Sequence, residues 1–481
     1  MTKGKQIDRN PWLTLTILAL AQFVVILDLT IVNVALPHIQ RDLHFSADGL
    51  QWVVNAYTLL FGGFLLLGGR AADLLGRRAL FIAGLAIFTG ASFMAGISQS
   101  STMMIAARAI QGLGGAMLSP AALSLVTVTF PHGRERNIAM GIWGALAGLG
   151  GTLGVILGGV LVTGISWRAV FFVNVPIGIA LITIAPLLIA ESRVAAGEAA
   201  RGFDIPGAVL GTGGLLGVVF GIVRTQALGW GSTEVIVSLA TGLAMLAAFV
   251  AVELRARSPL MPMRLFQPKG MRASSVAVTL NGAAFLSMFF LTAIFLQQVR
   301  GKSALGTGLE LLPMGLAAIV SAVISSTFVT RVGTRSVQLV GGALSVAGLF
   351  ALSQAGADGS YVTALLPGLV LFGAGLIAIG VPAQIAAVAE VEHRDAGAAS
   401  AIINSANQIG GALGLAVITT IANSHVTALV HSGLPTRLAL AGGFQRGLMV
   451  AAVVAAVNLL FVIGAPQIRP DAELVAAAAG A

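Results

Sequence analysis

The sequence predicts an all-α polytopic membrane protein with two six-helix bundles and two inserted helices. Three observations lead to this prediction: a composition poor in charge, fourteen long apolar runs, and a repeat at a fixed offset. Of the 481 residues, 57% are apolar and 9% are charged, whereas soluble domains contain about 25% charged residues. The chain therefore has too little charge to cover a water-facing surface, and a lipid bilayer is its expected surrounding.

The remaining composition excludes several classes of function. The net charge of +9 does not indicate a nucleic-acid partner, because the basic residues lie in short gaps between apolar runs rather than in one patch. The absence of cysteine excludes disulfides and thiolate metal sites, and the six histidines show no metal-ligand spacing. No nucleophile–base pair indicates an enzyme, and neither a metal nor an organic cofactor is expected.

Apolar runs of about twenty residues recur fourteen times, and each is long enough to cross a bilayer as a helix. The first run, Leu13–Pro37, is too long for the apolar part of a signal peptide and is interpreted as a retained first helix. The runs begin at Trp12, Leu50, Ala79, Thr102, Asn137, Arg168, Asp204, Thr233, Met271, Ala304, Ser336, Val362, Ala396 and Arg446.

The distribution of Lys and Arg predicts the orientation of these spans. With the amino terminus inside the cell, 19 Lys and Arg lie in the tails and inner loops, 7 lie in outer loops, and Arg108 lies within a span. Both termini are therefore predicted to be cytoplasmic. The excess of Arg over Lys, with abundant Ala and Gly, favours a bacterial source and hence the bacterial inner membrane.

A repeat at an offset of 260 residues indicates an internal duplication. HGRERNIAMG and EHRDAGAASA both open a span, and glycines recur in the helices that follow: Gly150, Gly151 and Gly154 match Gly410, Gly411 and Gly414. Two copies in one orientation are related by an axis along the membrane normal, as in alternating-access transporters. The predicted division is residues 1–195 for the first bundle, 196–258 for the inserted helices and 259–481 for the second bundle.

Five motifs carry a resemblance to a known family. They are LDLTIVNVALP (Leu27–Pro37), GRAADLLGRR (Gly69–Arg78), RAIQGLGGA (Arg108–Ala116), GGTLGVILGG (Gly150–Gly159) and SWRAVFFVNVPIG (Ser166–Gly178). Together they make the chain resemble the major facilitator superfamily, specifically its fourteen-helix drug:proton antiporter family, over nearly its whole length. The resemblance implies the major facilitator fold, export of drugs or antibiotics, and protons as the coupling ion.

Two positions depart from the motifs of that family. The loop motif usually has Arg directly after its Asp, where this chain has Leu74, and the antiporter motif usually has Pro after Gly154, where this chain has Val155. The missing proline removes the kink it would cause in the fifth span. The choice between antiport and symport therefore stays open at this point.

Asp28 is the first candidate for proton coupling. A charged carboxylate in the middle of a membrane helix costs at least ~2.5 kcal/mol, so it persists where it faces protein, water or a transport pathway. Burial makes a carboxyl hold its proton more tightly, which suits a proton carrier, and the alternative is a structural acid bonded to a neighbouring helix. At 100° per residue, Gln22 and Asn33 lie within about 20° of each other and about 120–140° from Asp28, which indicates two functions on two helix faces.

Arg108 and Glu310 are the other two candidates for proton coupling. Arg108 lies inside a span and needs acceptors: it either relays a proton to a nearby carboxylate or bonds backbone carbonyls statically. Glu310 lies about two turns into the tenth span, where it is either a second proton site, an anchor for a cationic substrate, or a water-accessible residue near the outer surface.

A gating loop and a glycine stripe complete the motifs with a predicted mechanical role. The loop residues allow a tight turn and charge pairing that can latch one side of the protein in one state, besides marking topology; they are Gly69, Asp73, Gly76, Arg77, Arg78, Arg134 and Glu135. The stripe has small residues every four positions and is expected to pack at the interface between the two halves; it consists of Gly150, Gly154 and Gly158.

The resulting hypothesis is that the protein is a proton-coupled antiporter that exports small amphipathic, cationic drugs or antibiotics. It is expected to be a monomer. The alternatives are a metabolite or lipid exporter or a proton symporter of the same fold, and a non-transporting receptor or scaffold. Polar residues within the spans are the candidates for the substrate cavity: Gln22, Asn33, Asn55, Tyr57, Gln111, Asn281, Gln384 and Asn404.

Overall fold

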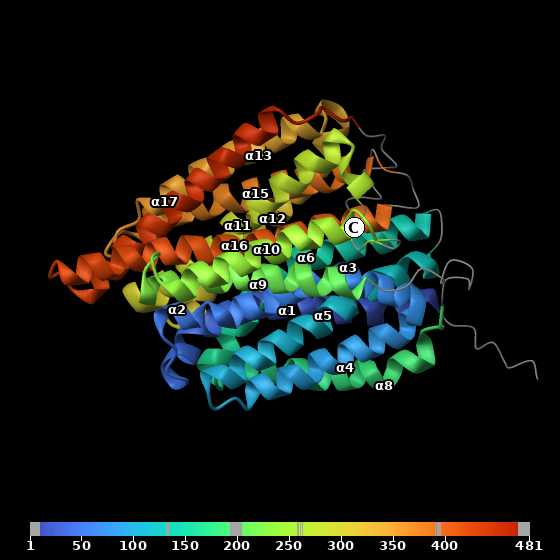
Figure 1. Cartoon of the computed structure of the whole chain (residues 1–481), viewed down its shortest axis with the longest axis horizontal. Helices are drawn as coiled ribbons and strands as arrows, with labels where there is room; N and C mark the ends of the chain where they lie inside the picture. The colour runs from blue at the N-terminus through green and yellow to red at the C-terminus, as the bar shows by residue number, and fades with distance from the viewer. Residues whose placement is uncertain are drawn as a thin grey trace, which may run out of the picture.

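The computed structural model shows long helices running side by side (Figure 1). It describes residues 10–130, 134–192, 204–256, 259, 261, 263–389, 391 and 396–469. Every regular element in these ranges is helical. We call the end where α1 begins and α17 ends the terminal end, and the opposite end, where α1 ends and α12 begins, the distal end.

The helices follow one another in this order: α1 (Pro11–Asp42), α2 (Ala47–Leu50), α3 (Trp52–Leu75), α4 (Arg77–Gly96), α5 (Ser101–Thr129), α6 (Arg134–Gly164), α7 (Ala169–Phe172), α8 (Asn174–Leu188), α9 (Ile205–Leu228), α10 (Thr233–Glu253), α11 (Lys269–Ile294), α12 (Ala304–Val332), α13 (Thr334–Ser353), α14 (Tyr361–Ala364), α15 (Leu366–Ala389), α16 (Ala396–His431) and α17 (Thr436–Ile463). Two short elements of other helical type are the 3₁₀ turn η1 (Met263–Phe266) and the π-helical turn η2 (Phe295–Val299), which continues α11.

The long helices have the dimensions of membrane spans. Within the described residues, 12 helices are long and apolar enough to cross a membrane, since about twenty apolar residues span the hydrocarbon core. Their side chains are apolar on the outside as well: Leu187, Val323 and Leu460 are each more than 60% exposed. Such exposure is unfavourable in water and is what lipid contact requires.

The turn between α3 and α4 recurs between α12 and α13. Gly76 has φ 110° and Gly333 has φ 83°, and each ends one helix and starts the next without a linker. Residues with a Cβ rarely adopt such positive φ angles, so glycine permits the sharp reversal. The two turns lie in the similar sequences LGRR (Leu75–Arg78) and VGTR (Val332–Arg335), which the structure therefore places at equivalent points of the fold.

Helix packing also repeats between the first and second parts of the chain. In the N-terminal group (α1–α8), α1 packs on α6, and α5 packs on both α3 and α4. In the C-terminal group (α11–α17), α11 packs on α16, and α15 packs on both α12 and α13. The same neighbour relations in the same order are what duplication of a helical unit produces.

The two groups meet along two seams, α3 against α16 and α6 against α12. The hairpin of α9 and α10 lies outside both groups, and α9 covers the first seam (Figure 1). There, Leu215 and Val219 of α9 share one apolar cluster with Leu59 of α3 and Ala412 of α16. The hairpin therefore touches both groups at the line where they join.

Candidate functional site

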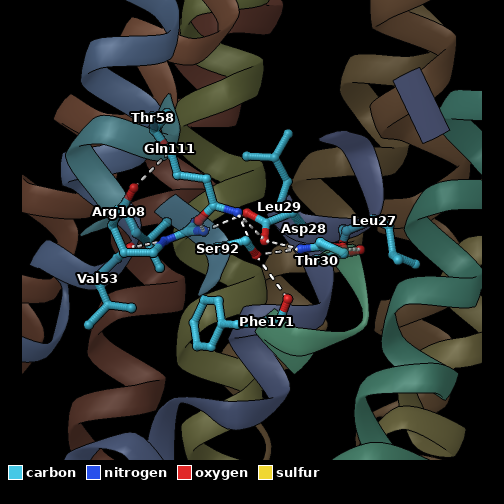
Figure 2. Close-up of polar contacts among 12 residues, drawn as sticks. Leu27, Asp28, Leu29, Thr30, Val53, Thr58, Ser92, Arg108, Gln111 and Phe171 are labelled. Carbon is cyan, nitrogen blue, oxygen red and sulfur yellow. Dashed lines mark hydrogen bonds and ion pairs between the residues drawn. The ribbon is translucent and has the colours of Figure 1, made fainter. Parts of the chain in front are cut away.

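Asp28 lies in the middle of α1, and its side chain is fully buried. Its Oδ2 accepts a hydrogen bond from a guanidinium nitrogen of Arg108 at 2.5 Å (Figure 2). Its Oδ1 accepts from the side-chain amides of Gln111 at 2.9 Å and Asn174 at 3.1 Å. Donors from α5 and α8 thus replace the water that this carboxylate lacks, which is the condition for burying it.

Arg108 enters the same cluster from α5 and is 1% exposed. Its Nε donates to the carbonyl oxygen of Val53 at 2.9 Å, and a terminal nitrogen donates to Gln111 Oε1 at 2.7 Å. The ring of Tyr57 lies 4.4 Å from the guanidinium carbon, a cation–π contact. The pair with Asp28 therefore bridges α1 and α5 inside the N-terminal group. Arg108 both pairs with a carboxylate and bonds a backbone carbonyl, and the proton relay stays a prediction.

Two further members of the cluster, Ser92 and Asn174, are not predicted by the sequence patterns. Ser92 Oγ donates to the carbonyl oxygen of Phe171 at 3.0 Å and accepts from the amides of Asn174 at 3.0 Å and Gln111 at 3.3 Å. Asn174 lies in the motif SWRAVFFVNVPIG, where a lone amide in an apolar helix is a usable signal. Ser92 carries no such signal, because small polar residues are common in packed membrane helices.

Tyr57 and Gln111 belong to the acid–arginine cluster (Asp28, Ser92, Arg108, Gln111, Asn174 and the Tyr57 ring). Both are predicted to line a substrate cavity, whereas the structure shows each fully buried against Arg108 or Asp28 inside one helix group. The prediction relied on polarity alone, and polarity cannot tell a residue that faces a cavity from one that faces a buried charge.

The other cavity candidates occupy different surroundings. Asn33 donates from Nδ2 to the carbonyl oxygen of Leu29 at 2.8 Å, in its own helix rather than in the acid–arginine cluster. Asn33 Oδ1, Gln22 Oε1 and both polar side-chain atoms of Asn55 are buried without a hydrogen-bond partner among the described residues. Such atoms cost free energy unless a ligand or water meets them, so these three residues stay substrate candidates, as does Tyr57, whose hydroxyl is also buried without a partner among the described residues.

The candidates in the second half of the chain lie on three helices. Asn281 of α11 is buried and donates to the carbonyl oxygen of Leu376 in α15 at 3.1 Å, so it joins two helices of the C-terminal group. Gln384 of α15 is half-buried, and Asn404 of α16 is exposed. The bond of Asn281 to α15 already accounts for its polarity.

Glu310 lies near the distal end of α12, away from the middle of the spans. Its Oε1 is 2.6 Å from Nζ of Lys302, a side chain that is 44% exposed. Burial lowers the pKa of the neighbouring Arg300 guanidinium, and the Glu310 carboxylate acts in the opposite direction. Glu310 is thus part of a charged group at the distal surface, where water reaches its partner.

The gating loop joins α3 to α4 at the terminal end. The amide of Arg77 donates to the carbonyl oxygen of Ser192 at 3.0 Å, and the amide of Arg78 donates to a carboxylate oxygen of Glu191 at 3.2 Å. The Arg78 side chain lies 3.8 Å from the same carboxylate. The loop is therefore held by the segment after α8, a partner that the sequence does not reveal.

The remaining gating residues are described in part. Gly69 lies in α3, where an added Cβ would lie 3.7 Å from the Cβ of Pro120, and Glu135 is exposed in the first turn of α6. The predicted pairing of Asp73 and Arg134 falls on side chains outside the described part of the structure.

The glycine stripe of α6 packs on α1, within the N-terminal group. A Cβ at Gly150 would lie 2.6 Å from the Ile26 side chain, and one at Gly158 would lie 3.1 Å from Ile31. The expectation that these glycines face the other half is therefore wrong. The contact between halves uses the adjacent side of α6, where a Cβ at Gly159 would lie 2.5 Å from the Cα of Leu305 in α12.

Replacing Gly154 by Ala is expected to destabilise the protein by about 1–3 kcal/mol, the usual cost of overpacking. The added methyl would overlap the Thr30 hydroxyl and lie 3.1 Å from the carbonyl oxygen of Leu27, next to Asp28. Gly90→Ala is the matched control, because nothing lies within 4 Å of a Cβ there and alanine favours a helix. Thermal unfolding in detergent measures both variants; a melting temperature raised equally by both would contradict the packing of α6 on α1.

Comparison with known proteins adds relatives of the whole chain. The model of the Major Facilitator Superfamily matches residues 18–415. The cephamycin export protein CmcT of Amycolatopsis lactamdurans is 41% identical over 426 residues, 87% of this chain and 85% of that protein. The puromycin resistance protein pur8 of Streptomyces alboniger is 38% identical over 458 residues, 94% of this chain and 90% of that protein.

Solved structures share the fold at low sequence identity. A bacterial homologue of the human lysosomal transporter Spinster superposes with a TM-score of 0.65 at 15% identity, covering 95% of this chain and 97% of its own. The POT family transporter PepTSo superposes with a TM-score of 0.64 at 14% identity, covering 95% of this chain and 99% of its own. These likenesses concern the fold alone.

Proposed function

We propose, on the premise that the chain belongs to the Major Facilitator Superfamily, that it is a proton-coupled antiporter exporting small amphipathic drugs or antibiotics. The chain is a membrane transporter of this family, not an enzyme, and its relatives include proteins named for antibiotic export and resistance. The proposal goes beyond the family in three respects: the proton as coupling ion, the direction in which it moves, and the class of substrate.

The observation that carries the proposal is the ion pair of Asp28 and Arg108 in the middle of the N-terminal group, 0% and 1% exposed. A proton on Asp28 removes the negative charge, which ends the ion pair and weakens the hydrogen bond, since only its guanidinium donor is then charged. The guanidinium then keeps Val53 and Gln111 as acceptors. The cluster therefore has two chemically distinct states that differ by one proton.

The position of Asp28 on α1 offers a route from that proton to substrate. Unpartnered amide atoms of Gln22 and Asn33 lie on another face of the same helix, so a shift of α1 on protonation changes the surface offered to substrate. Antiport requires proton and substrate to favour different states of the transporter, which makes their binding mutually exclusive in effect. If the proton and the substrate each favour a different position of α1, this requirement is met although the two do not bind to the same surface.

The proposal includes a topology. The helices α3 and α6 have 24 and 31 residues and complete fourteen spans together with the twelve apolar helices. The domains are residues 1–195 and 259–481, with residues 196–258 as the inserted pair, and the protein is a monomer in the bacterial inner membrane. Both termini are cytoplasmic, so the terminal end faces the cytoplasm, and the coupling ion is the proton.

Proton movement driven by substrate is the test. Purified protein is reconstituted into liposomes that contain a pH-sensitive dye, and puromycin, taken from a relative's name, is added outside. Antiport drives protons outward and makes the lumen alkaline, whereas symport makes it acidic. Protein-free liposomes are the control, because they show the pH change caused by passive entry of the amine. The panel of substrates also includes a cephamycin. If no substrate in the panel gives a larger pH change than in protein-free liposomes, the proposal is refuted.

A further inference from the structure

The two helix groups are joined at the distal end by hydrogen bonds that cross between them. The described bonds are Gln297 Nε2 to the carbonyl oxygen of Val34 at 3.0 Å, Gln298 Nε2 to Gln40 Oε1 at 2.9 Å, Thr419 Oγ1 to Gln51 Oε1 at 2.6 Å, and the Leu305 amide to Thr163 Oγ1 at 3.3 Å. Seven of the eight residues lie in the distal halves of their helical elements, and Gln51 directly precedes the distal start of α3. The distal end is therefore closed in this structure.

The bond between Gln51 and Thr419 is the most buried of the four. Gln51 is 0% exposed and Thr419 is 2% exposed, whereas the bond between Gln298 and Gln40 is at the surface. The residues come from the start of α3 and the distal half of α16, which form one of the two seams. A bond in this position is shielded from water as long as the seam is closed.

The Thr419 hydroxyl also has an acceptor in its own helix. The carbonyl oxygen of Leu415 lies 2.5 Å from Thr419 Oγ1, at the spacing typical of a threonine bonding back along a helix. When the seam opens, the hydroxyl can donate there, and Gln51 meets the water that enters. The bond across the seam therefore stabilises the closed state, but breaking it costs only a modest free energy, because both groups find other partners when the seam opens.

Apolar packing does not fill the distal end. A cavity of about 60 Å³ lies between the groups, lined by Gln40 and Leu50 on one side and by residues such as Phe295, Ala422 and Phe444 on the other. This space exceeds the roughly 10–15 Å³ that one water needs. Side chains around this space lose dispersion contacts, so the crossing bonds add to the closure provided by the apolar cluster that both groups share, which includes Ile39, Leu50, Phe295 and Ala422.

The crossing bonds are all between neutral groups. Of the described ion pairs at this end, Arg168 with Asp42, Lys302 with Glu310 and Arg437 with Asp358 each stay within one helix group. The fourth, Arg224 with Glu234, stays within the α9–α10 hairpin. Charged pairs therefore stiffen each group, while amides and hydroxyls join the groups to each other.

We propose that Gln51 and Thr419 form the buried latch of the distal gate. Both are positioning residues, and the hydrogen bond between them sets the fraction of time for which the gate is closed. The latch rests on the proposed function, since a gate has a role in a transporter that opens to each side in turn. It predicts that losing the bond shifts the protein towards a distally open state without touching the acid–arginine cluster.

The experiment measures that shift directly. The chain contains no cysteine, so Ile165→Cys and Val362→Cys, at exposed distal positions of the two groups, accept spin labels without other changes. The distance between the labels reports distal opening. Thr419→Val should raise the open-to-closed ratio roughly two- to tenfold, the range expected for one buried hydrogen bond, and Thr419→Ser should restore it.

Thr307→Val is the matched control. Thr307 is equally buried at the distal end, but its hydroxyl bonds the carbonyl oxygen of Ser303 in the same helix at 3.0 Å. Gln51→Leu tests the latch from the other side, and the double variant Gln51→Leu/Thr419→Val should open no further than either single one. If Thr419→Val fails to fold, Gln51→Leu decides alone.

The outcomes separate the latch from the proposed antiport. An unchanged ratio in Thr419→Val and Gln51→Leu, or an equal rise in Thr307→Val, overturns the latch. These distances are recorded without substrate and at one pH, so they do not depend on proton coupling. A latch that opens as expected in a protein without drug-driven proton movement supports the gate and refutes the antiport.

Discussion

Replacing Asp28 by Asn is expected to reduce drug-driven proton movement to the level of protein-free liposomes. Asn has nearly the shape of Asp and keeps an oxygen that can accept from Arg108, but it carries no proton that titrates. Its amide nitrogen replaces an oxygen that now accepts from two amides, and because an amide nitrogen cannot accept, both of that oxygen's bonds are lost as well. The measurement is the dye assay in liposomes with variant and wild type at equal protein density.

Two controls separate loss of coupling from loss of the protein. Asp28→Glu keeps a carboxyl and should retain part of the proton movement. Exchange of labelled substrate across the membrane, with no pH gradient, should continue in Asp28→Asn, because exchange needs alternating access but no net proton transfer. Proton movement in Asp28→Asn equal to that of the wild type would remove Asp28 from the coupling mechanism.

Replacing Arg108 by Leu is expected to destabilise the protein by about 3–5 kcal/mol, the cost of leaving one partner of a buried ion pair alone. The change leaves the Asp28 carboxylate without its charged partner and Val53 without its side-chain donor. Thermal unfolding in detergent reports the loss. Arg108→Lys keeps the charge but loses the planar group that reaches several acceptors, so its effect should lie between those of Arg108→Leu and the wild type.

The double variant Asp28→Asn/Arg108→Leu gives the sharper comparison. If the cost of Arg108→Leu comes from the stranded carboxylate, the double variant should be more stable than Arg108→Leu alone. Additive losses would mean that Arg108 stabilises the protein through Val53, Gln111 and Tyr57 rather than through Asp28.

The sequence predicts the parts of the site whose burial is costly. A carboxylate and a guanidinium inside apolar runs need partners wherever they lie, which is why Asp28 and Arg108 can be identified without a structure. Ser92 and Asn174 are not predicted, because burying a small neutral side chain in a helix bundle costs little free energy. The acid–arginine cluster thus follows from the sequence in its charges and not in its neutral members.

Relations between helices are the part that the sequence leaves open. Glycines every four residues on α6 predict a close helix neighbour, but the pattern does not say which one, and the neighbour is α1 rather than the other half. The bond of Gln51 and Thr419 joins residues 368 positions apart, and neither is unusual in its local sequence. Repeats and spans are local or periodic properties, so they can be read from the chain, whereas pairings across seams depend on how whole groups dock.

The two helices of the inserted hairpin stand under different constraints. The helix α9 touches both groups, while α10 packs mainly on α9. In the most apolar 18-residue stretch of α10, 11% of the residues are buried. A side chain on α10 therefore meets lipid more often than protein, and lipid accepts any apolar shape. An exchange of one apolar residue for another on α10 is therefore expected to change the stability of the protein little, whereas the same exchange on the buried face of α9 disturbs the seam that this helix covers.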